Sequence, residues 1–153
     1  KTALYVATVA RTYRKAIDDY MKDPKLYEAN MEWYKEEIGK CTYREFTTGF
    51  YFGKPGSDAQ IYNSNTYVKN YTYLGTVEEA DGKGRCRIEQ KNKFSVGETI
   101  EIMKPDGRNL EVVVKSICDE DGNGQESAPH PKQVLYIDLG HPLEKYDILR
   151  RKE

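Results

Sequence analysis

The chain has 153 residues, 32% of them charged, and a formal net charge of -1. This length can bury the core of one domain, or of a small domain with an appendage, without disulfide or metal staples. A balanced charge gives no overall attraction to a phosphate backbone, although a local basic patch can still exist. No apolar run approaches the roughly 20 residues that cross a bilayer, so we expect no membrane partner. Because the helical pattern already runs at Lys1, we interpret the chain as part of a longer polypeptide.

The first 40 residues predict a helical hairpin. Apolar residues recur at steps of three and four, as on one helix face; they are Val6, Val9, Ala10, Tyr13, Ala16, Ile17 and Tyr20. Asp23-Pro24 signals a second helix, since Asp caps free amides and Pro is tolerated at the first helical position. The second apolar stripe consists of Tyr27, Met31, Tyr34 and Ile38. Both stripes must pack on the β part or on protein outside this chain.

After Tyr43 the pattern changes to short β-prone runs separated by turns. The predicted strands are 71–78, 85–90, 99–103, 109–117, 133–139 and 147–150. Strands at roughly ten-residue spacing with no intervening helix predict a small antiparallel β-barrel. The fold class is therefore mainly β with an N-terminal helical hairpin, divided into a helical segment, 1–42, and a barrel, 43–153. We interpret the segment 46–50, Phe-Thr-Thr-Gly-Phe, as the join between the two.

The residues that could support catalysis form no known constellation. Cys41, Cys86 and Cys118 are far apart and lack a CxxC motif, so we expect reduced thiols in a cytoplasmic protein. A Cys–His pair would need His130 or His141 beside one of them, but histidines flanked by proline are more typical of turns. Nucleophile elbows, Gly-rich phosphate loops and HExxH helices are absent from the sequence. We expect no catalytic residue and no cofactor in this chain.

One acidic loop resembles the opening of a calcium-binding loop. Asp119, Asp121 and Asn123 alternate and are accompanied by Gly122, which suits a hard cation. The twelfth position is His130, where a bidentate Glu is required, and no helix pattern flanks the loop. A solvated acidic turn is the favoured interpretation, with these three residues as the weaker metal alternative.

A tyrosine-rich stretch precedes the first predicted barrel strand. It includes Tyr62, Tyr67, Tyr71 and Tyr73, interleaved with Lys69 and several asparagines. Such side chains could stack on nucleic acid bases or on peptide side chains. The alternative is that they occupy half-buried strand positions with their hydroxyl groups at the surface.

Several ordered motifs resemble the C-terminal region of the peptidase U32 family. They are Tyr5–Val9, Tyr13–Asp18, Arg44–Phe50, Gly97–Glu101, Ala128–Gln133 and Tyr146–Arg150, so the resemblance covers essentially the whole chain. It implies a C-terminal β-barrel like those of translation factors, preceded by a catalytic domain. Residues 1–42 would be the tail of that domain, and their helices would pack against it. Members include collagenolytic proteases and relatives needed for hydroxylation of RNA bases. The family's cysteine-containing signature has no counterpart here, and Lys132 stands where relatives often have Gln.

From these observations we expect a non-catalytic accessory domain that positions a protein or RNA substrate for the upstream catalytic domain. The candidate contacts are Arg44, Tyr51, Tyr62, Tyr67, Lys69 and His130. An RNA-binding module of a tRNA or rRNA hydroxylation protein, a structural or oligomerisation barrel, and a peptidase that uses His130 or His141 with a cysteine are the alternatives.

Overall fold

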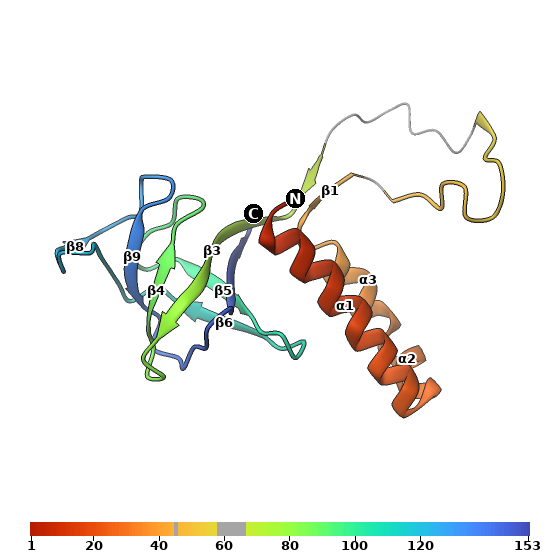
Figure 1. Ribbon diagram of the computed structural model, residues 1–153, viewed down its shortest axis with the longest axis horizontal. Helices are drawn as coiled ribbons and strands as arrows, with labels where there is room; N and C mark the ends of the chain where they lie inside the picture. The colour runs from red at the N-terminus through yellow and green to blue at the C-terminus, as the bar shows by residue number, and fades with distance from the viewer. Residues whose placement is uncertain (45, 58–66) are drawn as a thin grey trace.

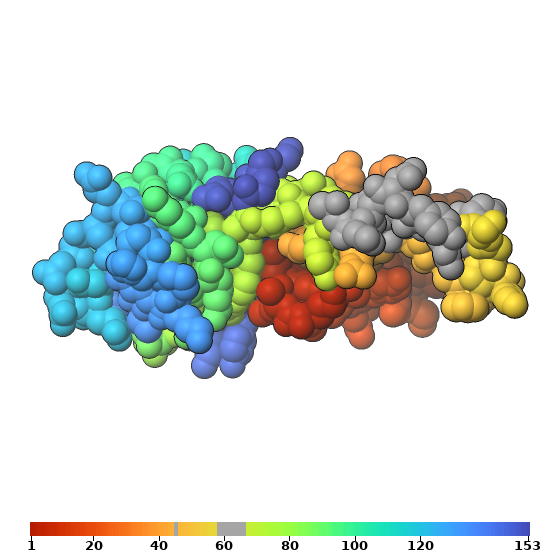
Figure 2. Space-filling model, turned by 90° about the horizontal axis from the view of Figure 1, so that it is seen from above, coloured from red at the N-terminus to blue at the C-terminus, as the bar shows by residue number. Residues whose placement is uncertain are grey.

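The computed structural model describes residues 1–44, 46–57 and 67–153. It is an elongated molecule with three helices beside a curled antiparallel sheet, and residues 46–57 extend away from the helical side (Figure 1). Seen from above, the half-barrel occupies one end of the molecule, and the helices and residues 46–57 occupy the other (Figure 2).

The helical part consists of α1 (Ala3–Lys22), α2 (Pro24–Ala29) and α3 (Met31–Ile38). The Asp23 carboxylate accepts a hydrogen bond from the backbone N–H of Lys25 (3.0 Å), which caps α2 as the sequence predicts. The hairpin is present, but its second arm is split at Asn30. The Asn30 side chain donates to the Asp19 carboxylate on α1 (2.9 Å), so this break in the second arm is attached to the first helix.

The sheet has eight strands, and all of its strand pairs are antiparallel. Its strands are β3 (Tyr71–Ala80), β4 (Arg85–Glu89), β5 (Thr99–Met103), β6 (Asn109–Val113), β7 (Ser116–Cys118), β8 (Gly124–Gln125), β9 (Val134–Asp138) and β10 (Ile148–Lys152). Their order is β6-β5-β10-β3-β4-β9-β7-β8. The predicted mainly β class is confirmed, and the barrel takes the form of a half-barrel.

The sheet curls because a single stretch of chain supplies strands to both of its ends. The predicted strand 109–117 is split at Val114 and Lys115, so β6 pairs with β5 and β7 pairs with β9. The Val114 N–H donates to the Glu98 carbonyl (3.0 Å), and the Lys115 N–H donates to the Asp138 carbonyl (2.8 Å). Two residues thus connect strands that are far apart in the strand order, which requires a curved sheet. Its concave side encloses the main core, which includes Leu74, Ile88, Ile102, Ile137 and Leu149.

A second, two-stranded sheet lies outside the half-barrel. It pairs β1 (Thr42–Tyr43) with β2 (Val68–Lys69), with Thr42 opposite Lys69. We call this the ribbon, and the described residues that it carries, 44, 46–57 and 67, form the arm (Figure 1). The prediction that 46–50 joins the barrel to the helices is wrong, because Phe46 and Phe50 are exposed on the arm.

Candidate functional site

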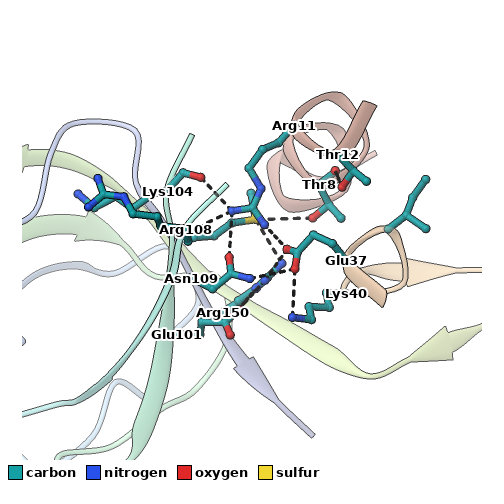
Figure 3. A network of polar contacts seen from close by, with 12 residues as sticks. Thr8, Arg11, Thr12, Glu37, Lys40, Glu101, Lys104, Arg108, Asn109 and Arg150 are labelled. Atoms are coloured by element: carbon teal, nitrogen blue, oxygen red, sulfur yellow. Dashed lines mark hydrogen bonds and ion pairs between the residues drawn. The ribbon is translucent and has the colours of Figure 1, made fainter. Parts of the chain in front are cut away.

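The junction between the helices and the half-barrel is made by buried charges. Glu37 on α3 is fully buried and accepts hydrogen bonds from Arg11 of α1, Arg150 of β10 and Asn109 of β6 (Figure 3). The Arg150 contact measures 2.7 Å and the Asn109 contact 2.9 Å. Glu101 of β5 completes the group, which we call the anchoring cluster, by accepting from Arg150 Nε (2.5 Å).

Arg11 extends the anchoring cluster into the turn between β5 and β6. Its Nη1 donates to the Lys104 carbonyl (2.9 Å) and to the Asn109 side-chain oxygen (2.9 Å). Arg150 is fully buried and also stacks over Tyr71, with its guanidinium carbon 4.9 Å from the ring centre. One carboxylate therefore links two helices and two strands through three side chains.

The electrostatics of the cluster keep Glu37 ionised. Burial by itself disfavours the charged carboxylate, but the charges of Arg150 and Arg11 outweigh it and hold the pKa of Glu37 below its ordinary value. A buried charge left without its partners is strongly destabilising, so these contacts hold the helices in one position on the sheet. A small apolar patch of Leu4, Met103 and Ile148 packs beside them.

The ribbon brings together three of the residues that the sequence nominates for binding. Arg44 stacks on Tyr67, with its guanidinium carbon 4.9 Å from the ring centre, and Arg44 Nη2 donates to the Tyr67 hydroxyl (3.3 Å). Lys69 follows on β2 and is exposed. The antiparallel pairing of β1 and β2 explains this proximity, because it places residues on both sides of the arm next to each other.

Further aromatic side chains extend along the arm. Phe50, Tyr51 and Phe52 are 77%, 84% and 82% exposed, and the rings of Tyr51 and Phe52 meet edge to face with centres 5.0 Å apart. Phe46 stacks on Tyr43 at 4.6 Å. Exposed aromatic rings at this density are unusual for a surface that contacts only water.

A groove of about 560 Å³ opens at the foot of the ribbon. Tyr71, Tyr73, Lys69 and Lys91 line it together with the start of α1. Tyr71 also stacks on Arg150, so a side chain that lines the groove contacts the anchoring cluster. The groove offers aromatic faces and two cationic groups to a ligand.

Charge is distributed unevenly along the molecule. The segment 39–77, which contains the ribbon and the arm, carries four cationic residues and two acidic ones. The hairpin of β7 and β8 lies at the other end of the molecule (Figure 1), and its segment 116–126 carries four acidic residues and no lysine or arginine. The neutral total therefore includes a segment of net charge +2 at the arm and a segment of net charge -4 at the hairpin.

The other predicted contacts do not join the ribbon. His130 is exposed in the connection between β8 and β9, at the end of the half-barrel away from the arm (Figure 1). Tyr62 lies outside the described residues. The sequence prediction thus groups residues from two ends of the molecule, and only Arg44, Tyr51, Tyr67 and Lys69 share the arm and its ribbon.

In the acidic loop, the Asp119 carboxylate accepts hydrogen bonds from residues of its own hairpin. Asp119 accepts from the backbone N–H groups of Asp121 (3.0 Å) and Asn123 (2.8 Å) and from the Asn123 side chain (3.0 Å). Within 1–44, 46–57 and 67–153, no group of three or more histidine, cysteine or acidic side chains is arranged to hold a metal ion. The loop has the geometry of a tight turn.

The thiols and histidines are arranged for structure. Burial raises the pKa of Cys86 to about 12 and also raises the pKa of Cys41, so neither provides a thiolate near neutral pH. His141 Nδ1 donates to the carbonyl of the adjacent Pro142 (2.9 Å), as expected of a turn residue.

The anchoring cluster is the feature that sequence reasoning missed. Glu37 lies on the same face of α3 as the buried Tyr34, three residues earlier. Arg150 follows Ile148 by two residues and so shares its side of a buried strand. A charge at an inward-facing position is the signal that could have identified both residues.

Comparison with known proteins matches both parts of the chain to one family. The sequence profile of the peptidase family U32 C-terminal domain matches residues 69–150, and that of peptidase family U32 matches residues 1–61. A crystal structure of the C-terminal domain of a putative U32 peptidase from Geobacillus thermoleovorans is 34% identical, with a TM-score of 0.48 over 53% of this chain and 91% of that one.

Curated relatives carry two kinds of name. Over 99% of this chain, "tRNA hydroxylation protein P1" of Bacillus subtilis (strain 168) is 33% identical and "tRNA hydroxylation protein P" of Escherichia coli (strain K12) is 28% identical. An uncharacterized protease of Methanocaldococcus jannaschii is 31% identical over 76% of this chain. The matches cover 36%, 33% and 29% of those proteins, so the chain spans about a third of their length.

No helix within the described ranges is both long and apolar enough to cross a membrane. The boundary at residues 42 and 43 stays a prediction. Because the C-terminal-domain profile alone covers residues 69–150, more than half of the chain, this protein belongs to the peptidase family U32 and carries its C-terminal domain.

Proposed function

We propose that this chain is a non-catalytic accessory module that positions an RNA substrate, of the tRNA class, for the U32 catalytic segment. The arm and its ribbon are the binding surface. The observation that carries the proposal is the arginine-on-tyrosine stack of Arg44 and Tyr67 beside the exposed rings of the arm. Unpaired bases stack on such rings, and cations at the same surface contact the phosphate backbone.

Two further observations support RNA as the substrate. Proteins named for tRNA hydroxylation align with this chain from end to end at 33% and 28% identity. The segment 39–77, with the arm and ribbon, has two more cationic than acidic residues, and the acidic hairpin of β7 and β8 lies at the other end of the molecule. RNA is therefore attracted more to the arm than to that hairpin.

The proposal is tested by fluorescence anisotropy with labelled tRNA. The double variant Arg44→Ala/Tyr51→Ala removes one cation and one exposed ring from the arm. Base stacking on an aromatic ring is worth about 1–3 kcal/mol, so we expect Kd to rise about tenfold or more. The matched control is Arg85→Ala/Tyr136→Ala, which removes an exposed arginine and tyrosine from β4 and β9. Equal affinities of the two double variants for tRNA would contradict the proposal.

A peptide substrate is the second candidate. It is favoured by the relative named as an uncharacterized protease and by the many apolar rings on the arm. Denatured collagen in the same assay distinguishes the two candidates. If the arm variant loses affinity for denatured collagen and keeps its affinity for tRNA, a peptide substrate replaces RNA as the proposed substrate.

A further inference from the structure

Helix α1 places its apolar face toward solvent and its polar face toward the rest of the chain. The side that packs on the sheet and on α3 carries Thr8, Arg11, Thr12 and Asp19, all buried, with Leu4 as its one buried apolar residue. At 100° per residue, the apolar residues lie on nearly the opposite side of the helix. We call Val6, Tyr13, Ile17, Tyr20 and Met21 the exposed apolar stripe.

The exposure of this stripe is large for every member. Tyr20, the least exposed, is 54% exposed, and Met21 reaches 78%. The sequence predicts all of these positions except Met21 as a helix face that must be covered, and the half-barrel does not cover them. Large apolar side chains in an unbroken row on a helix mark a contact surface, since single exposed residues of this kind are ordinary and rows are not.

One hollow lies on the stripe itself, and a second lies beside it on the same helix. One, of about 390 Å³, is lined by Tyr13, Ile17, Tyr20 and Met21 together with Tyr27 of α2 and Ala16. A second, of about 310 Å³, lies where α1 meets the sheet and is lined by residues that include Ala7, Ala10, Met103, Tyr146 and Ile148. The salt bridge between Arg14 and Asp18 (2.8 Å) runs beside the stripe as a charged rim. An apolar centre with a polar rim is the usual anatomy of a specific interface.

The size of the relatives identifies the occupant. The matched segment makes up 36%, 33% and 29% of three curated relatives and includes the family's C-terminal domain, so most of their remaining length precedes it. The helices themselves fall within 1–61, which matches the profile of peptidase family U32 and not that of its C-terminal domain. The helices thus match the family's main segment in sequence but are attached to the half-barrel by the anchoring cluster.

We propose that the exposed apolar stripe of α1 is the docking surface for the preceding U32 segment of the same polypeptide. The polar face of α1 then holds the half-barrel through Arg11 and Glu37, and its apolar face holds the preceding segment. Helix α1 is the element through which the position of the arm is fixed relative to that segment. This inference does not depend on which substrate the arm binds.

The test is cysteine labelling with a maleimide in a Cys118→Ser background, since Cys41 and Cys86 are buried. The Ile17→Cys variant reports on the stripe, and Tyr13→Cys serves as a second reporter should Ile17→Cys fail to fold. Val113→Cys is the matched control, because Val113 is an exposed apolar residue (48%) on β6. Each variant is made in the 153-residue chain and in a polypeptide that joins it to a preceding U32 segment of the length found in the relatives.

We expect the labelling rate at residue 17 to fall about tenfold or more in the longer polypeptide, because a reagent reaches a covered site only after local opening. The rate at residue 113 should not change. Equal rates at residue 17 in both polypeptides would overturn the proposal. Protection that appears in the 153-residue chain alone and grows with its concentration would overturn it in favour of a second copy as the occupant.

Discussion

The anchoring cluster and the arm each contain an arginine that stacks on a tyrosine. The two pairs have the same distance between guanidinium carbon and ring centre, but their surroundings differ. Arg150 lies 4.9 Å from the ring centre of Tyr71, and Arg44 lies 4.9 Å from that of Tyr67. Arg150 is fully buried and bonded to Glu37 and Glu101. Arg44 and Tyr67 are exposed where the arm leaves the ribbon.

The difference shows how context decides what such a pair does. In the junction, carboxylates neutralise the Arg150 guanidinium and fix its orientation, so this group is not accessible to a ligand. On the ribbon the same stack keeps its outer face and its charge accessible, which suits recognition of bases or phosphates. We therefore expect the first pair to contribute to stability and the second pair to binding.

The largest expected effect is the loss of the central carboxylate in Glu37→Ala. It leaves Arg11 and Arg150 buried without their shared partner, so we expect the free energy of unfolding to fall by about 3–5 kcal/mol. Urea denaturation followed by circular dichroism measures this. The control Glu32→Ala removes an exposed carboxylate from the same helix and should change stability by less than about 1 kcal/mol. A similar loss in both variants would break the comparison.

The next effect is on affinity and not on stability. Tyr51→Ala removes a ring that is 84% exposed, so we expect the unfolding free energy to stay within about 0.5 kcal/mol of the parent. Its affinity for tRNA should fall about tenfold, by the loss of one stacking platform. Anisotropy titration and urea denaturation of the same sample separate the two quantities. A stability loss comparable to that of Glu37→Ala would show that the arm is structural.

A smaller effect, on the salt dependence of tRNA affinity, separates the role of the Arg44 charge from the role of its stacking. Arg44→Lys keeps the cation but loses the planar group that covers Tyr67. We expect the slope of log K against log salt to be unchanged, whereas Arg44→Gln should lower its magnitude by about one unit. Titrations at several salt concentrations measure this. If both variants change the slope equally, Arg44 does not contact phosphate.

The smallest effect is a pH dependence confined to acid. The pKa of Glu37 lies below its ordinary value of 4.5, so the unfolded chain takes up this proton before the native chain does. The stability that Glu37 supplies is complete above about pH 4.5 and is lost as pH falls through its lower native pKa. Glu37→Gln has no ionisable carboxyl group at this position. The difference in unfolding free energy between the parent and this variant should therefore narrow as pH falls from about 6 to about 3. A deficit that stays constant over this range would contradict the assigned ionisation.

The sequence predicts the regular elements well because their signals are local. The apolar steps of three and four in the first helix, Asp23 as a cap and the short β-prone runs each act within a few residues. The split at Val114 and Lys115 was missed because it is set by pairing with Glu98 and Asp138, which no local pattern shows.

The site is predicted less completely, and for a related reason. Arg44, Tyr51, Tyr67 and Lys69 are chemically suited to binding and share the arm and its ribbon. His130 has similar chemistry but lies at the other end, since composition carries no information about distance. The sequence leaves the orientation of α1 open between the β part and protein outside this chain, because periodicity identifies an apolar face without saying what covers it.

The most direct test of the account is photo-crosslinking of the chain to tRNA that carries 4-thiouridine, followed by mass spectrometry of the linked peptides. We predict that crosslinks concentrate in residues 44–57 and 67–73, where the arm, the ribbon and the groove lie. Crosslinks concentrated on β4 and β9, with few on the arm, would contradict the account.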